Sequence, residues 1–154
     1  MTVSDTSPLI ALARIGRLGL LAQVYGEVIV PPVVEDEIIR HRRGFGGPRP
    51  NWLLIHAVQD RGGVDTLEQS LDPGESEAIA PAIQLNARLV IDDGRGRRVA
   101  ESLGLEVVGT VGTLLAAKGA GIVPVLRPLL KELRGTGFRI SDDLIERVCR
   151  TAGE

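Results

Sequence analysis

Short apolar runs rich in valine and isoleucine alternate with helix-length segments along most of this chain, and this alternation constrains the fold most strongly. The runs predict strands around Val3 and over 27–30, 88–91 and 105–109, with a further strand over 53–58. Buried strands that alternate with helices are typical of proteins with a mainly parallel sheet. We therefore expect an α/β fold with such a sheet at its centre.

The segments between the runs carry helix signals. They predict helices over 8–14, 15–24, 31–43, 72–87, 95–103 and through the C-terminal part from about residue 113. The clearest start is at Asp72, which can cap a helix, with Pro73 at the first helical position and Glu75 three residues after the cap. Pro81 lies inside the same segment, so we expect a kink or a break there. Ser141 is expected to cap the last helix.

Length and composition limit the classes of function. A chain of 154 residues is expected to form one domain, residues 1–154. The net charge of −2 gives no global attraction to nucleic acid, and the one Trp, one Tyr and two Phe argue against an extended base-stacking surface. Cys149 is the only cysteine, which excludes an internal disulfide and argues against a cysteine-ligated zinc site. The sequence shows no signal peptide and no membrane-spanning stretch, so we expect a soluble, cytoplasmic protein.

Three aspartates directly follow predicted strands: Asp5 after the first, and Asp92 and Asp93 after the run at 88–91. Ligand sites in open parallel sheets form beyond the carboxyl ends of the strands, so we expect these carboxylates to lie together. A cluster of like charges needs a cation, and an all-oxygen cluster suits Mg²⁺ or Mn²⁺. Simpler roles stay open, because Asp5 or Ser7 can cap the helix after SDTSP and Asp93 can cap the helix that begins near Arg95.

Two glutamates fall on the apolar faces of predicted helices. Glu37 lies close to the face that Val34 and Ile38 define, and Glu75 lies on the same face as Ala78. A carboxylate beside a core-facing stripe needs a partner. Glu37 can instead be a boundary residue paired with an arginine, and Glu75 can instead complete the helix cap. One side chain does not easily fill both roles, and for Glu75 we favour the functional one.

Four ordered motifs together resemble the PIN-domain nucleases: SDTSPLI at 4–10, VPPVVEDEI at 30–38, GESEAIAPA at 74–82 and LVIDD at 89–93. Each motif is short, but the ordered set covers nearly the whole chain. The interval of 18 residues from Glu75 to Asp93 agrees with the family, and it selects Asp93 over Asp92 and Glu75 over Glu77. A glutamate at the third acidic position departs from many PIN domains but keeps the carboxylate.

The resemblance implies a three-layer α/β/α PIN-like fold and a Mg²⁺- or Mn²⁺-dependent endoribonuclease. The catalytic metal ligands that it implies are Asp5, Glu37, Glu75 and Asp93, with Asp92 assisting. Thr6 and Ser7 are expected to hydrogen bond to the acids or to the waters of the metal. The likeness is greatest to VapC-type toxins of toxin–antitoxin pairs, which implies a cognate antitoxin as partner and a homodimer.

Two groups of arginines accompany the acids. Arg95, Arg97 and Arg98 follow LVIDD, and we expect them to contact the RNA backbone, because guanidinium groups pair well with phosphate. Arginines in the first turns of a helix are also often a solvated surface, and that alternative stays open. The second group can guide substrate, meet an acidic partner or be surface; it consists of Arg40, Arg42 and Arg43.

The main alternative function is a catalytically inactive PIN-like interaction module, in which the acids are remnants paired with arginines. A phosphotransferase of the haloacid dehalogenase type needs a second aspartate two places after the first, where Ser7 stands. A dinucleotide-binding enzyme is also disfavoured, because no full glycine fingerprint follows the first strand.

Overall fold

The computed structural model describes residues 1–40, 45–57, 59 and 61–154. Arg42 and Arg43 of the second basic group, and the end of the helix expected over 31–43, lie outside the described residues. The strands are β1 (Thr2–Ser4), β2 (Val28–Val30), β3 (Leu53–Ile55), β4 (Arg88–Val90) and β5 (Val107–Val108). They form one sheet in the order β3-β2-β1-β4-β5, and every pairing is parallel. The α/β expectation is confirmed.

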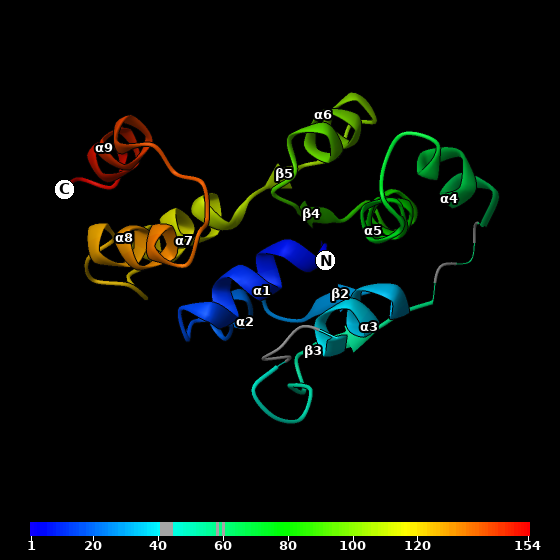
Figure 1. Ribbon diagram of the computed structural model, residues 1–154, viewed down its shortest axis with the longest axis horizontal. Helices are drawn as coiled ribbons and strands as arrows, with labels where there is room; N and C mark the ends of the chain where they lie inside the picture. The colour runs from blue at the N-terminus through cyan, green and yellow to red at the C-terminus, as the bar shows by residue number, and fades with distance from the viewer. Residues whose placement is uncertain (41–44, 58, 60) are drawn as a thin grey trace.

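Nine helices are described along the same residues, and they connect or follow the strands (Figure 1). They are α1 (Thr6–Arg14), α2 (Leu20–Tyr25), α3 (Pro32–Arg40), α4 (Arg61–Glu68), α5 (Pro73–Leu85), α6 (Gly94–Ser102), α7 (Thr110–Gly119), α8 (Arg127–Gly135) and α9 (Asp142–Thr151). No helix of the described ranges is long and apolar enough to cross a membrane.

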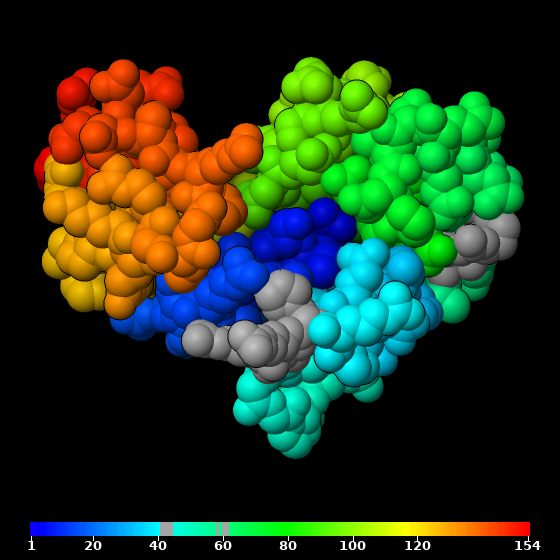
Figure 2. Space-filling model, in the orientation of Figure 1, coloured from blue at the N-terminus to red at the C-terminus, as the bar shows by residue number. Residues whose placement is uncertain are grey.

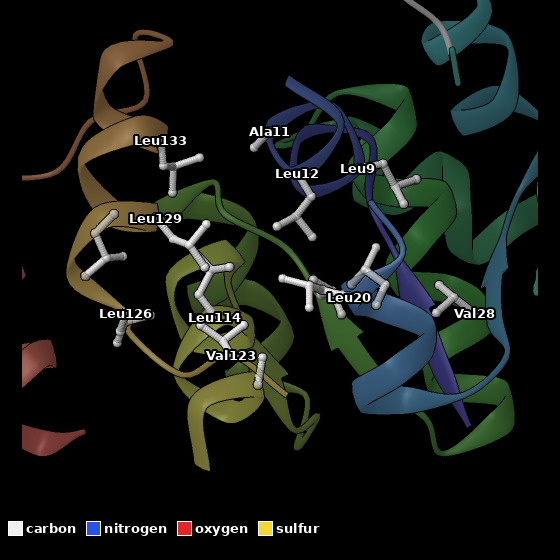
Figure 3. Packing of buried hydrophobic residues seen from close by; sticks show 14 of the residues in the cluster. Leu9, Ala11, Leu12, Leu20, Val28, Leu114, Val123, Leu126, Leu129 and Leu133 are labelled. Atoms are coloured by element: carbon white, nitrogen blue, oxygen red, sulfur yellow. The ribbon is translucent and has the colours of Figure 1, made fainter. Parts of the chain in front are cut away.

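Alternation of side chains along the short strands divides the core into two layers. In β2, Val28 and Val30 join one hydrophobic cluster while Ile29 packs against the other, as the period of two in a strand requires. The larger cluster holds Leu12 of α1 together with residues of α2, α3, α7, α8 and α9; Figure 3 shows α1 and α2 facing α7 and α8 there. The smaller cluster joins α5 and α6 to the opposite face. The three-layer α/β/α fold follows.

Several boundaries differ from the sequence prediction for local reasons. The helix expected over 15–24 begins only at Leu20, because Gly16 adopts a positive φ of 68° directly after α1. The predicted break at Pro81 is wrong: α5 runs through it, since the packed face of the helix outweighs the roughly 3 kcal/mol that an interior proline costs. Helix α4 was not predicted at all, because GG at 62–63 disfavours a helix locally.

The last helix gives a direct test of a predicted cap. The Ser141 Oγ accepts a hydrogen bond from the Leu144 N–H at 3.1 Å, which satisfies one donor of the first turn of α9. Replacing Ser141 by alanine is expected to lower the free energy of unfolding by about 1 kcal/mol and Tm by about 3 °C. Ser141→Asp, which restores the acceptor, should match the wild type in thermal unfolding. Equal Tm values for the alanine and aspartate variants would contradict the cap.

Candidate active site

The pairing of β1 with β4 sets the position of the first acid. Ser4 stands opposite Val90, and the Asp5 N–H donates to the Val90 carbonyl at 2.9 Å, so the two strands end side by side. Asp5 is only 3 % exposed, and its side chain makes no capping hydrogen bond to α1. Burial raises its pKa to about 8, the Thr6 backbone N–H opposes that rise, and Asp72, Glu75 and Glu37 add to it. Asp5 thus stands at the N-cap position of α1, but its carboxyl group makes no side-chain capping hydrogen bond there.

Glu37 reaches the same edge of the sheet from α3. The Thr6 hydroxyl donates to the Glu37 Oε2, as expected for a residue that hydrogen bonds to the acids. A Cβ on Gly74 would lie 2.8 Å from the Glu37 Oε1, so the carboxylate occupies space at the start of α5 that only a glycine leaves. Glu35, on the same helix, pairs with an arginine: its Oε2 lies 3.4 Å from the Arg49 Nη1. Glu37 points toward the other acids.

Glu75 and Asp72 form the capping box of α5. The Glu75 N–H donates to the Asp72 Oδ1 at 2.8 Å, and the Asp72 N–H donates to the Glu75 Oε2 at 3.3 Å. Glu75 also lines the cleft described below, and burial, with Asp72 and Asp93 nearby, raises its pKa to about 7. The capping role that was the alternative for Glu75 is therefore confirmed, and its role as a metal ligand stays a prediction.

Asp92 and Asp93 separate at the end of β4. Asp92 accepts from the Thr110 N–H at 2.7 Å and from the Thr110 hydroxyl at 2.6 Å; burial raises its pKa, and these bonds and Arg97 oppose the rise. Asp93 is exposed and caps α6 by accepting from the Gly96 N–H at 2.7 Å. Asp92 and Asp93 both line the cleft. Asp93 therefore caps α6, which was the alternative role considered for it, and also belongs to the acidic edge of the sheet.

The three arginines of α6 diverge. Arg97 lines the cleft beside Asp92, and a Cβ on Gly109 would lie 2.6 Å from the Arg97 Nη1. Arg95 donates to the Ser70 carbonyl at 3.2 Å. Arg98 is exposed, and its guanidinium lies close to Gly94. Neither Arg95 nor Arg98 is among the residues that line the cleft. The arrangement therefore favours Arg97 alone for contact with a ligand in the cleft.

The acids form one side of a cleft of about 790 Å³. Figure 2 shows this hollow between α6 and the C-terminal elements, with α1 at its floor. Its lining includes the acids Asp72, Glu75, Asp92 and Asp93; Ser7, Ile10 and Arg14 of α1; and Thr136, Gly137, Phe138 and Arg139 of the α8–α9 loop. Neither Asp5, which is buried, nor Glu37, which is half-buried, is among the residues that line the cleft. No motif in the sequence indicates that Arg14, Phe138 and Arg139 line the same cleft as these acids.

The donor chemistry of this edge fits a hard divalent cation. Asp5 and Glu75 hold protons to unusually high pH because they are buried beside other carboxylates, and a cation would relieve that repulsion. Ser76, next to Glu75, also buries an Oγ without a hydrogen-bond partner in the described part of the chain. No group of three acids or histidines among the described residues is yet arranged closely enough to hold a metal. The candidate ligands would therefore have to move closer together to hold a cation.

Replacing Asp5 by asparagine is expected to stabilise the metal-free protein at pH 8 and to change little near pH 4. The folded protein keeps the Asp5 proton up to about pH 8, whereas the unfolded chain releases it near the ordinary pKa of 3.8. The protonated Asp5 carboxyl therefore contributes its full stabilisation at low pH, and this contribution is lost as the pH rises from 3.8 to about 8. An asparagine has no such proton to lose, so the variant keeps its stability over this range. Thermal unfolding in chelator should show Tm roughly 5 °C higher for the variant at pH 8. Parallel pH profiles would contradict the prediction.

Comparison with known proteins agrees with the architecture. A family model described as a PIN domain matches residues 1–154. Searches of curated proteins and of solved structures found no significant match. PIN domains are generally nucleases, and they usually use divalent metals. With a parallel three-layer fold, acids at the carboxyl edge of β1 and β4, and a family match over the full sequence, this chain belongs to the PIN-domain family.

Proposed function

We propose that this protein is a Mg²⁺- or Mn²⁺-dependent endoribonuclease. One observation carries the proposal: carboxylates from four separate segments crowd one edge of the sheet beside a cleft, where burial and then neighbouring acids raise the pKa of Asp5 and of Glu75. Side chains that only stabilise a fold rarely gather this much like charge without a partner. Membership in a family of nucleases supports phosphodiester hydrolysis over other metal chemistry.

Asp5, Glu37, Glu75 and Asp93 would hold the metal, with Asp92 beside them. When bound, such a cation stabilises the negative charge on the phosphoryl oxygens and lowers the pKa of water. Side chains of the protein position the acids around the cation. Thr6 orients Glu37 through its hydroxyl, and Thr110 fixes Asp92 with two hydrogen bonds. Asp92 lies near Arg97, and both line the cleft, so its negative charge would favour a guanidinium position from which Arg97 could bind a phosphate of the substrate.

The expected activity is RNA cleavage that depends on added Mn²⁺ or Mg²⁺. Asp5→Asn and Glu37→Gln are each expected to lower the cleavage rate about 100-fold or more, because each removes a charge that holds the cation. Glu35→Gln is the matched control on α3, since Glu35 pairs with Arg49 instead of facing the other acids. Circular dichroism checks folding, and a rise of Tm on adding Mn²⁺ reports metal binding apart from activity.

Full activity in folded Asp5→Asn and Glu37→Gln proteins would contradict this assignment. A folded wild-type protein that neither binds Mn²⁺ nor cleaves RNA would favour the inactive interaction module instead.

We also propose that the protein is the toxin of a toxin–antitoxin pair, acts in the cytoplasm and forms a homodimer. The support is the likeness of its four motifs to VapC-type toxins and its membership in the PIN family. Such a toxin should stop growth when it is expressed alone, and Asp5→Asn should relieve the arrest. Coexpression of the small protein encoded beside it should also relieve the arrest and yield a stable complex. Normal growth with active wild-type protein would contradict the toxin role.

A further inference from the structure

We propose that the α8–α9 loop forms a subsite for single-stranded nucleic acid, in which Phe138 stacks on an unpaired base and Arg139 binds a neighbouring phosphate. This inference rests on the proposed function and deepens it, because it names the residues that hold the strand beside the site of cleavage. Such a subsite would also make the cleft prefer single strands over duplexes.

The loop lies across the cleft from the acids. Thr136, Gly137, Phe138 and Arg139 line one side, while Asp72, Glu75 and Asp93 line the other. Figure 2 shows the C-terminal elements and α6 on either side of the hollow. A phosphate bound near the acids would therefore place the adjoining nucleotide within the same cleft as the loop.

Both ends of the loop are anchored. The Thr136 hydroxyl donates to the Leu133 carbonyl at 2.6 Å, which ties the start of the loop to α8. Ile140 is buried, and Ser141 caps α9. Gly137, with a φ of +98°, allows the turn between these anchors. Phe138 and Arg139 are thus held by the fold before any ligand binds, which lowers the entropy cost of binding.

Phe138 has the setting of a stacking platform. The ring is half-buried and packs against the larger hydrophobic cluster, yet it also lines the cleft. Bases within a duplex are already stacked on their neighbours, so only an unpaired base can lie against such a ring. The scarcity of aromatic residues argued against an extended stacking surface, and a single ring in the cleft suits a single base.

Arg139 supplies positive charge on the side of the cleft whose lining residues include no acid. It is exposed, and no ion pair between described residues involves it, whereas Arg134 of α8 pairs with Asp142. A phosphodiester strand in this cleft meets repulsion from the acidic side. A guanidinium on the opposite side offsets that repulsion and can bind phosphate through two nitrogens.

The test measures binding of labelled RNA in an Asp5→Asn background, because Asp5 does not line the cleft and its loss prevents cleavage. The probe is a single strand of about 12 nucleotides, within the range that single-strand sites cover. Arg139→Gln should weaken binding about 10-fold and make the slope of log K against log salt shallower by about 0.7. Arg147→Gln, exposed on α9 and outside the cleft, is the matched control and should bind as the background protein does.

Phe138→Leu should weaken binding of the same strand about 5- to 10-fold but leave an abasic strand of equal length unaffected. A duplex of the same sequence should bind more weakly and show no dependence on Phe138. Unchanged affinity with Arg139→Gln, or equal losses for the normal and abasic strands with Phe138→Leu, would overturn the subsite.

Cleavage by proteins that keep Asp5 is measured separately, and Tm confirms folding. Cleavage without these affinity losses would overturn the subsite alone. The affinity losses without cleavage would overturn the ribonuclease and support the subsite.

Discussion

The parallel contact between β1 and β4 is the interaction on which the rest of this site depends. Because Ser4 pairs with Val90, β1 and β4 end side by side at the same edge of the sheet. Asp5 therefore lies at the edge where Asp92 and Asp93 follow β4. The N–H of Asp5 bonds back to Val90, so the carboxyl group is held almost out of solvent. Burial then makes its ionisation costly, and the charges of Asp72, Glu75 and Glu37 add to that cost.

Helix starts make this crowding tolerable. The first turns of α5 and α6 lie at the same edge, and their free N–H groups bond to Asp72 and Asp93. The positive ends of two helix dipoles therefore face the acids, which offsets part of the repulsion. The same ends favour an incoming phosphate once a cation neutralises the carboxylates. In the proposed function, Glu75 and Asp93 would serve both in the caps and as metal ligands.

Two glycines provide the space that the acids occupy. A side chain on Gly74 would collide with Glu37, and one on Gly109 would collide with Asp92 and Arg97. Both glycines have ordinary backbone angles, so their role at the site is close approach rather than an unusual turn. A glycine in a motif such as GESEAI is therefore better understood through what packs against it than through local flexibility.

The α/β class, most elements, the capping box at Asp72 and the position of acids directly after two strands could be predicted from the amino-acid sequence, because these depend on local periodicity and on the residues next to each strand end. The sequence also indicated that Glu37 faces the interior, since helical spacing fixes direction. It could not show that Asp92 bonds to Thr110, that Arg95 and Arg98 turn away, or that Phe138 and Arg139 meet the acids across a cleft. Those relations join segments distant in sequence, and only the packing of α6, α7 and the α8–α9 loop around the sheet decides which of their side chains share the same space.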